Sequence, residues 1–530
     1  MPRNAIETQA VVGDKPFSPA LDRFEALVTR LEDQECLGMS HSELERVIEV
    51  DGREILRCLF QAHLDLRSAD EADGRVIGAD DDRDDARKRG RKRERQLEVV
   101  FGTVTVERYG YTKPGEPSLF VLDGYLNLPP ESYSFGLRRK IALEAAKVSF
   151  DEVVASVESN NGVRVPKRQV EQLARRAAVD FDDFYAQRTH DEVVVGDEIL
   201  AITTDGKGIC MLIEHLRDAT REAAKNREPK LDKRQSKGEK SKKRRMAQVA
   251  AVYTVARFER GVDDIAGALG STTTTAPCEK PKRPKPHNKR VWASVKEDSW
   301  DVIDEAFTEA KRLDPDRDKQ WVALIDGGTD QLEGVLESIG RAGCKVTVIL
   351  DIIHVLEYLW DAGRALLGEG TRESQSWVTK RLRALLEGKD IGQIAAGMRR
   401  SATMRGLSKT LRKPVDKCAG YLLKYADFMK YDEALAAGLP ISTGVIEGAC
   451  RYLVRDRMDI TGARWSVDGA EAVLRLRALR ASGDFDEYWR FHEACELRRN
   501  HLARYADEAL PELSPPGRGK TSRSHLRLVS

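Results

Sequence analysis

The chain has 530 residues and a formal net charge of only +1, because its 88 Lys and Arg nearly balance its 87 Asp and Glu. At about 150 residues per domain, this length predicts three or four domains, and the 41% hydrophobic content argues against global disorder. No apolar run approaches the roughly 18 residues of a membrane span, the first residues lack the apolar stretch of a signal peptide, and the eight cysteines form no Cys-x-x-Cys pair. We therefore expect a reduced, cytosolic protein with no membrane partner and no zinc ribbon.

Helices, a charged linker and a hairpin are predicted for the first part of the chain. Residues 18–70 carry apolar residues at helical spacing. Residues 71–95 are dominated by charge, since an acidic run at 80–85 leads into ARKRGRKRER, and we expect a linker there. The next stretch, LEVVFGTVTVERYGY, alternates apolar and polar residues around a glycine, which predicts a β-hairpin.

A small helical module is predicted over residues 135–178. Ser149 can cap one helix whose first turn carries Asp151 and Glu152, and a basic second helix follows the loop SNNGVRVPKRQ. Two helices joined by a glycine-containing turn resemble a DNA-binding helix-turn-helix, although most such sequences are plain helical hairpins. Both interpretations stay open at this point.

Strands and helices alternate in the middle of the chain. DEILAITTDGKGICML predicts a buried strand that ends at Asp205, MAQVAAVYTVARF predicts a second strand, and residues 268–290 are typical of an exposed loop. Helix, strand, helix and strand then follow up to Asp351, which predicts an α/β sheet with at least two parallel strands. Residues 371–436 are helical throughout in pattern, and residues 442–505 hold at least two more helices.

The near-zero net charge hides several basic segments. Residues 225–245 hold eleven Lys and Arg against three acids, an excess of +8, and residues 279–290 hold six against one, an excess of +5. The last residues, PPGRGKTSRSHLRLVS, contain four Arg and Lys and no acid. Any one such run can be a solvated loop, but several on one chain favour a polyanionic partner such as DNA, because basic side chains release counterions from phosphates.

Three acids follow predicted strands. Asp205, Asp326 (WVALIDGG) and Asp351 (VTVILDIIH) each come at a strand end, where α/β sheets bind their ligands. Converging carboxylates suit Mg²⁺ or Mn²⁺. A single Asp in this position more often caps a helix or starts a turn, but three in succession favour a metal site. The sequence has no Gly-x-Ser-x-Gly, phosphate-binding loop or dinucleotide-binding motif that would point to other chemistry.

A fourth acid lies in STGVIEGACRYLVRDRMDITGARWS (442–466). Ser442 or Thr443 can cap a helix in which Glu447 sits beside an apolar stripe. A Glu in the first turns of a helix is also common because it suits the helix dipole. Glu447 is therefore a candidate metal ligand only in combination with the acids that follow the strands.

Five segments together resemble the ISKra-type bacterial insertion-sequence transposases. They are DGKG (205–208), GEKSKKRRMAQVAAVY (238–253), LIDGGTDQL (324–332), LDIIHVLEYLW (350–360) and the Glu447 segment. The resemblance covers about residues 95–495, and the segments occur in the family's order. It implies a DDE transposase with an RNase H-like core, two divalent ions (Mg²⁺ or Mn²⁺), and DNA strands that are cut or joined.

Carried over residue by residue, the resemblance assigns catalysis and metal binding to Asp205, Asp326 and Glu447. Asp351 is the alternative second acid; Asp326 is preferred because the family's second Asp lies on the strand next to the first. Asp351 and His354 would then support the metal ligands from beside them, although a His on an apolar helix is more often a packed core residue. Many family members carry a zinc module near the hairpin, but YTKPGEPSLFVLDGYL has no Cys, so no zinc is expected.

The expected architecture is a multidomain α/β fold in which an RNase H-like core with an all-helical insertion follows helical and β-hairpin DNA-binding regions. Arg464 and Trp465 could steer or stack on a DNA end, although a Trp here equally suits an anchor between helices. The expected parts are a helical region with the charged linker (1–95), the hairpin and helix-turn-helix-like module (96–190), the first part of the core (191–354), the insertion (355–440), the C-terminal core helices with Glu447 (441–505) and a basic tail (506–530). Residues expected to contact DNA are Lys207, Lys233, Arg234, Lys240, Lys242, Lys243, Arg244, Arg245, Arg464 and Trp465.

We therefore expect a bacterial, nucleoid-associated DNA transposase that cleaves transposon ends and joins the freed 3′-OH to target DNA. Handling two ends implies a homo-oligomer on DNA. Two alternatives are a metal-dependent nuclease of the same fold, which cuts without joining, and a catalytically silent, transposase-derived DNA-binding protein. A purely structural helical scaffold leaves the strand-end acids and basic segments unexplained.

Overall fold

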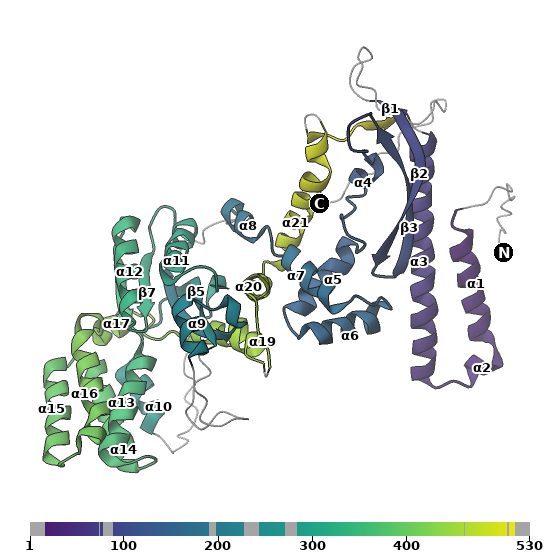
Figure 1. The fold of residues 1–530 in the computed structure, drawn as a ribbon. Coiled ribbons are helices and arrows are strands. Elements are labelled where there is room, and N and C mark those ends of the chain that lie inside the picture. Colours follow the sequence, from purple (N-terminus) through teal and green to yellow (C-terminus); the bar gives the residue numbers. More distant parts are fainter. Residues whose placement is uncertain are drawn as a thin grey trace, which may run out of the picture. The chain divides into compact units, whose positions relative to one another are not determined.

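The computed structural model describes residues 16–73, 75–77, 88–189, 198–226, 243–270, 283–460, 462–505 and 508–514, and it is a mixed α/β protein (Figure 1). The chain forms two compact units. Unit 1 comprises Met1–Asp180 and Asp486–Ser530, and unit 2 comprises Phe181–Phe485. Among the helices of the described part, none is long and apolar enough to cross a membrane.

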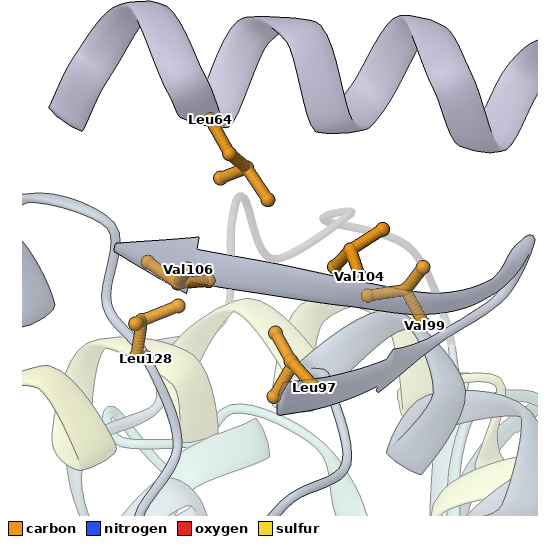
Figure 2. Close-up of a cluster of buried hydrophobic side chains, with 6 residues drawn as sticks. All are labelled: Leu64, Leu97, Val99, Val104, Val106 and Leu128. Carbon is orange, nitrogen blue, oxygen red and sulfur yellow. The ribbon is translucent and has the colours of Figure 1, made fainter. Parts of the chain in front are cut away.

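Unit 1 is built around a long helix packed on a β-hairpin. The helices α1 and α3 pack along each other, and α3 lies over the hairpin strands (Figure 1). The first elements are α1 (Ser18–Glu32), α2 (Gln34–Leu37), α3 (His41–Asp73), β2 (Lys88–Val99) and β3 (Gly102–Thr112). Apolar side chains that alternate along both strands meet α3 in one buried cluster, which Figure 2 shows: Leu64, Leu97, Val99, Val104, Val106 and Leu128.

The expected helices over residues 18–70 and the expected hairpin are confirmed, but the linker expected over residues 71–95 is wrong at its basic end. Residues 88–95 belong to β2 and pair with β3. The charged side chains are accommodated there because they find partners within unit 1: Lys92 pairs with Glu107, and Arg95 donates to the Glu131 carbonyl (2.6 Å). The acidic part of the expected linker, residues 80–85, lies outside the described residues.

The helical module is confirmed as α5 (Phe135–Ala145), α6 (Phe150–Asn161) and α7 (Lys167–Arg176). Ser149 caps α6 as expected and forms a reciprocal capping box with Glu152. The helix ends at Gly162, whose φ of 66° is the left-handed conformation that glycine adopts without strain. The remaining elements of unit 1 are α4 (Val121–Tyr125), α21 (Phe485–Asn500), η4 (Leu502–Arg504), and the short pair β1 (Arg75–Ile77) and β9 (Glu512–Ser514).

The last long helix, α21, belongs to unit 1, whereas the sequence suggested that it completes the core with Glu447. Its Tyr488 hydroxyl donates to the carbonyl of Ala177 (2.8 Å), and the carbonyl of its Glu493 accepts from Asn127 (3.0 Å). Two stretches of chain from opposite ends of the sequence thus form one core.

Unit 2 contains a mixed five-stranded sheet in the order β6-β5-β4-β7-β8. β5 runs antiparallel to both of its neighbours, β6 and β4, while β4, β7 and β8 run parallel. The strands are β4 (Glu198–Cys210), β5 (Arg244–Ala256), β6 (His287–Ser294), β7 (Gln320–Ile325) and β8 (Val346–Leu350). The parallel pair expected from the sequence is confirmed.

Two expectations about these strands are wrong. β4 does not end at Asp205 but continues to Cys210, because β5 goes on pairing with it beyond the end of β7. β6 begins at His287, inside the loop expected over residues 268–290. It pairs with β5, and its residues from Arg290 to Ser294 are buried. Residues 271–282 of the expected loop lie outside the described residues.

Helices cover the sheet and extend from it. Phe307 of α11 packs against the Trp321 ring of β7 (6.4 Å between centroids), so α11 covers the sheet face to which Trp321 points. The expected all-helical stretch before Glu447 is confirmed as α14 to α17. The helices and turns of unit 2 are α8 (Phe181–Gln187), η1 (Ile213–His215), α9 (Asp218–Lys225), α10 (Val262–Gly270), α11 (Ser299–Leu313), α12 (Thr329–Ala342), α13 (Ile352–Leu367), α14 (Arg372–Leu386), α15 (Ile391–Met404), α16 (Lys409–Lys424), η2 (Ala426–Phe428), α17 (Tyr431–Ala436), α18 (Gly444–Ala449), the π-helix η3 (Cys450–Arg455), α19 (Asp456–Met458) and α20 (Val467–Ser482).

Replacing Leu64 with Ala tests the packing of α3 on the hairpin. Leu64 is 3% exposed and belongs to the cluster in Figure 2, so L64A should destabilise unit 1 by about 2–5 kcal/mol. Backbone amides of β2 and β3 should then exchange hydrogen faster in the full chain. Leu56→Ala is the matched control on the same helix, because Leu56 is 47% exposed and should leave the exchange rates unchanged. Equal protection in both variants would mean that the hairpin does not depend on α3.

Candidate metal centre

The parallel strands bring three of the expected acids to one edge of the sheet. Thr203 of β4 pairs with Leu324 of β7, and the next β7–β8 pair joins Ile325 to Leu350. Continuing each register by a residue or two places Asp205, Asp326 and Asp351 in one row. Neighbouring strands lie about 4.8 Å apart, and residues level with one another point to the same face. The backbone therefore sets the three acids level with one another, with Asp326 and Asp351 directly after their strands and Asp205 within β4.

Asp205 lies on β4 and is held by the helix that carries Glu447. The Cys450 thiol donates a hydrogen bond to Asp205 Oδ2 (3.1 Å), and Asp205 Oδ1 accepts from the Gly206 amide (2.6 Å). Burial and the Asp205 charge raise the pKa of the Cys450 thiol well above its usual range, so it stays protonated and donates. Cys450 begins the π-helix η3, and such wider turns are frequent at functional sites.

Asp326 begins the loop that follows β7, and a residue of α16 in the helical stretch is hydrogen-bonded to this loop. Its backbone amide donates to Gln331 Oε1 (2.9 Å), and Gln331 Nε2 donates to the carbonyl of Thr204 (2.7 Å), the residue before Asp205. The hydroxyl of Tyr421 on α16 donates to the Asp326 carbonyl (2.8 Å). These contacts tie the backbones of both acids together. Within the described chain, the side chain accepts one hydrogen bond, from Gly328 to Oδ1 (2.7 Å), which leaves Oδ2 available.

Asp351 has a different environment. It is 0% exposed, and both of its carboxylate oxygens are used: one accepts from the Ile353 amide (2.8 Å) and the other from the Thr443 hydroxyl. Asp351 is therefore the N-cap of α13 and joins that helix to the segment before Glu447. Burial raises its pKa, against the hydrogen bonds that lower it. Of the two alternatives for a second acid, Asp326 has the more accessible carboxylate.

Glu447 lies on α18, exposed, among the other acids. Its pKa is raised by desolvation and by the negative charges of Asp351, Glu357 and Asp205, whereas His354 lowers it. No side-chain hydrogen bond or ion pair of Glu447 occurs among the described residues. Within the described chain, the ligand atoms of Asp205, Asp326 and Glu447 do not all lie within 4.8 Å of one another, and both Asp205 oxygens accept hydrogen bonds. Carboxylates suit a hard divalent cation, which would have to draw these three closer together.

The expected DNA-contacting residues are found in different settings. Lys207 is exposed on β4 two residues after Asp205, a spacing that puts both residues on the same face of the strand. Arg244 and Arg245 are bound within unit 2, to Asp459 (2.8 Å) and to the Val295 carbonyl (2.7 Å), beside the half-buried Lys243. Lys233, Arg234, Lys240 and Lys242 lie outside the described residues.

Arg464 and Trp465 differ in accessibility. Arg464 is exposed, but Trp465 is only 6% exposed and donates from Nε1 to the Met458 carbonyl (3.1 Å). The backbone amide of Leu212 donates to the Trp465 carbonyl (2.9 Å), which fixes the segment beside the end of β4. Trp465 thus serves as an anchor inside unit 2, and stacking of its ring on DNA is not compatible with this burial.

A second group of metal-binding residue types lies in unit 1. Asp180, His492 and Glu496 are buried, their ligand atoms lie within 4.8 Å of one another, and they could hold a metal ion. Arg499 occupies the same group, since it pairs with both Asp180 and Glu496, and His492 Nδ1 shares a hydrogen bond with Asp180 (2.6 Å). The sequence reasoning missed this group. The spacing of His492 and Glu496 by four helical residues was a signal, but nothing local pointed to Asp180.

Comparison with models of protein families gives no match, and comparison with curated proteins gives none either.

Gly327 makes the close approach between the Asp326 loop and α16 possible. Its φ is 89°, and an added Cβ would lie 2.6 Å from the Tyr421 hydroxyl. Gly327→Ala should therefore destabilise unit 2 by about 1–3 kcal/mol through backbone strain alone, measured by chemical denaturation of the full chain. Gly340→Ala is the control: this exposed glycine of α12 has nothing near its Cβ position, so the substitution should be neutral or slightly stabilising. Equal stability of the two variants would mean that the close contact between the Asp326 loop and α16 does not depend on a glycine at position 327.

Proposed function

We propose that this chain is a DDE-type DNA transposase whose catalytic core is unit 2, with Asp205, Asp326 and Glu447 as metal ligands. The observation that carries the proposal is the parallel register of β4 and β7, which sets Asp205 level with Asp326 while Cys450 fixes the Glu447 helix against Asp205. Carboxylates set level on neighbouring strands repel one another, and a divalent cation between them would offset that repulsion.

The sheet order supports an RNase H-like core. An RNase H-like fold places the strand of the second acid beside the strand of the first, and β7 lies beside β4. The helical stretch from α14 to α17 precedes the Glu447 helix, as the insertion of the resembled ISKra-type transposases does. These points favour a transposase of this type over a structural scaffold.

The residues around the acids have separable roles in the proposed site. Two divalent ions, Mg²⁺ or Mn²⁺, held by Asp205, Asp326 and Glu447 would activate a water and stabilise the leaving oxygen of a phosphodiester. Tyr421 and Gln331 hold the Asp326 loop, and Cys450 orients the Asp205 carboxylate through its hydrogen bond. The exposed Lys207 supplies positive charge near the site for a DNA phosphate. Positioning of this kind is the protein's main contribution to phosphodiester chemistry.

Conservative substitutions of the acids test the proposal. With Mg²⁺ and a supercoiled plasmid that carries the DNA flanking the coding sequence, the wild-type chain should nick the plasmid and join the cut ends to a second plasmid. Asp205→Asn, Asp326→Asn and Glu447→Gln should each lower the nicking rate by about a hundredfold or more. Asp330→Asn is the matched control, because Asp330 is exposed on α12 only four residues after Asp326.

Asp351→Asn distinguishes the two candidates for the second acid. An Asn can still accept from the Ile353 amide and can face the Thr443 hydroxyl, so the fold should persist and nicking should fall less than tenfold. A large loss in D351N with little loss in D326N would exchange their roles. Nicking without joining would favour the nuclease alternative, and DNA binding without nicking would favour the silent DNA-binding alternative.

A further inference from the structure

A cavity of about 370 Å³ opens beside the candidate metal centre within unit 2. Its apolar wall is formed by Val255, Phe258, Pro440 and Val445 together with the buried Tyr253. This volume lies in the range of pockets that hold a small organic group, and an apolar wall of this kind suits the face of a flat ring.

Three basic side chains form the other part of the lining: Arg260, Arg283 and Lys285. Arg260 donates to the Leu439 carbonyl, but its Nε is buried with no hydrogen-bond partner among the described residues. Burial, and then the charge of Arg283, lower the pKa of Arg260. An anion in the cavity would relieve this repulsion and use the free Nε–H, so the lining is suited to a ligand that carries a phosphate next to an apolar ring.

The cavity shares structure with the acidic edge of the sheet. Gly444 and Val445, which line it, begin the helix that carries Glu447 two residues later. Burial raises the pKa of the Tyr253 hydroxyl to about 12, and Tyr253 lies on β5, four residues after the Val249 that pairs with Asp205. A strand whose phosphodiester lies at the acids would have its neighbouring nucleotide within reach of the cavity.

We propose that this cavity binds one unpaired nucleotide of the DNA strand, with its base against Phe258 and Val445 and its phosphate on Arg260, Arg283 and Lys285. The inference rests on the proposed function for the identity of the ligand as DNA. It adds a binding site for the nucleotide next to the cleaved bond. This nucleotide must unpair from the complementary strand to enter the cavity. Unpairing costs free energy that stacking in the cavity returns only in part, so a frayed or single-stranded end is favoured over an intact duplex.

The test follows single-stranded oligonucleotides that carry one 2-aminopurine, bound by the full chain with Ca²⁺ in place of Mg²⁺ to prevent cleavage. At one position of the label, binding should quench the fluorescence by stacking. Ala256→Trp fills the cavity from an exposed lining position and should abolish this quenching. The double variant Arg283→Gln/Lys285→Gln, which changes two exposed side chains, should weaken binding about tenfold. Arg405→Gln/Lys409→Gln removes the same charge from an exposed part of the helical stretch and should leave the quenching intact.

The outcomes separate this inference from the proposed function. Unchanged quenching in A256W, with wild-type folding by circular dichroism, would overturn the cavity as the base site even if the wild-type chain cleaves DNA. Binding of free deoxyadenosine monophosphate, lost in the Arg283/Lys285 variant, without binding of oligonucleotides would assign the cavity to a mononucleotide and overturn the DNA strand as its ligand. If the chain neither binds nor cleaves DNA, the proposed function fails together with this inference.

Discussion

The parallel pairing of β4 with β7 is the constraint on which the candidate site depends. It fixes two carboxylates at the same level of adjacent strands, where they repel each other unless a cation lies between them. The antiparallel pairing of β4 with β5 continues past this level to Cys210, whereas the pairing of β4 with β7 stops at Thr203. At Asp205, β4 is therefore hydrogen-bonded to β5 on one side and is open on the β7 side. The open side is where Asp326, Glu447 and a metal ion can meet.

The helices around the sheet act mainly by holding the acids in place. Tyr358 stacks on Tyr421 (4.1 Å between ring centroids), and Tyr421 and Tyr425 both donate to the backbone of the Asp326 loop. Asp351 joins β8 and α13 to Thr443, just before the Glu447 helix. A site whose second and third acids are positioned through such contacts can be lost by changes far from the carboxylates, and this gives the helical stretch a role beyond covering the core.

The sequence predicted the order of strands and helices in unit 2 and the acids that directly follow β7 and β8, because apolar runs followed by Asp are local signals. It could not predict how far β4 continues, since the partner β5 lies some forty residues away and decides where pairing stops. Nor could it distinguish Asp326 from Asp351, because the difference lies in the hydrogen bond from Thr443, which is distant in sequence. The basic strand β2 was taken for a linker since the partners of its charges come from elsewhere in unit 1. Cys450, Gln331 and Tyr421 gave no local signal at all.

The central claim is that Asp205, Asp326 and Glu447 together bind divalent metal, and anomalous diffraction from crystals of the full chain soaked in Mn²⁺ tests it most directly. The account predicts one or two Mn²⁺ peaks about 2.0–2.6 Å from carboxylate oxygens of these three residues. Asp351 should keep its hydrogen bonds to Ile353 and Thr443. Peaks found only at Asp180, His492 and Glu496, or a metal bound by Asp351 with Asp326 turned away, would contradict it.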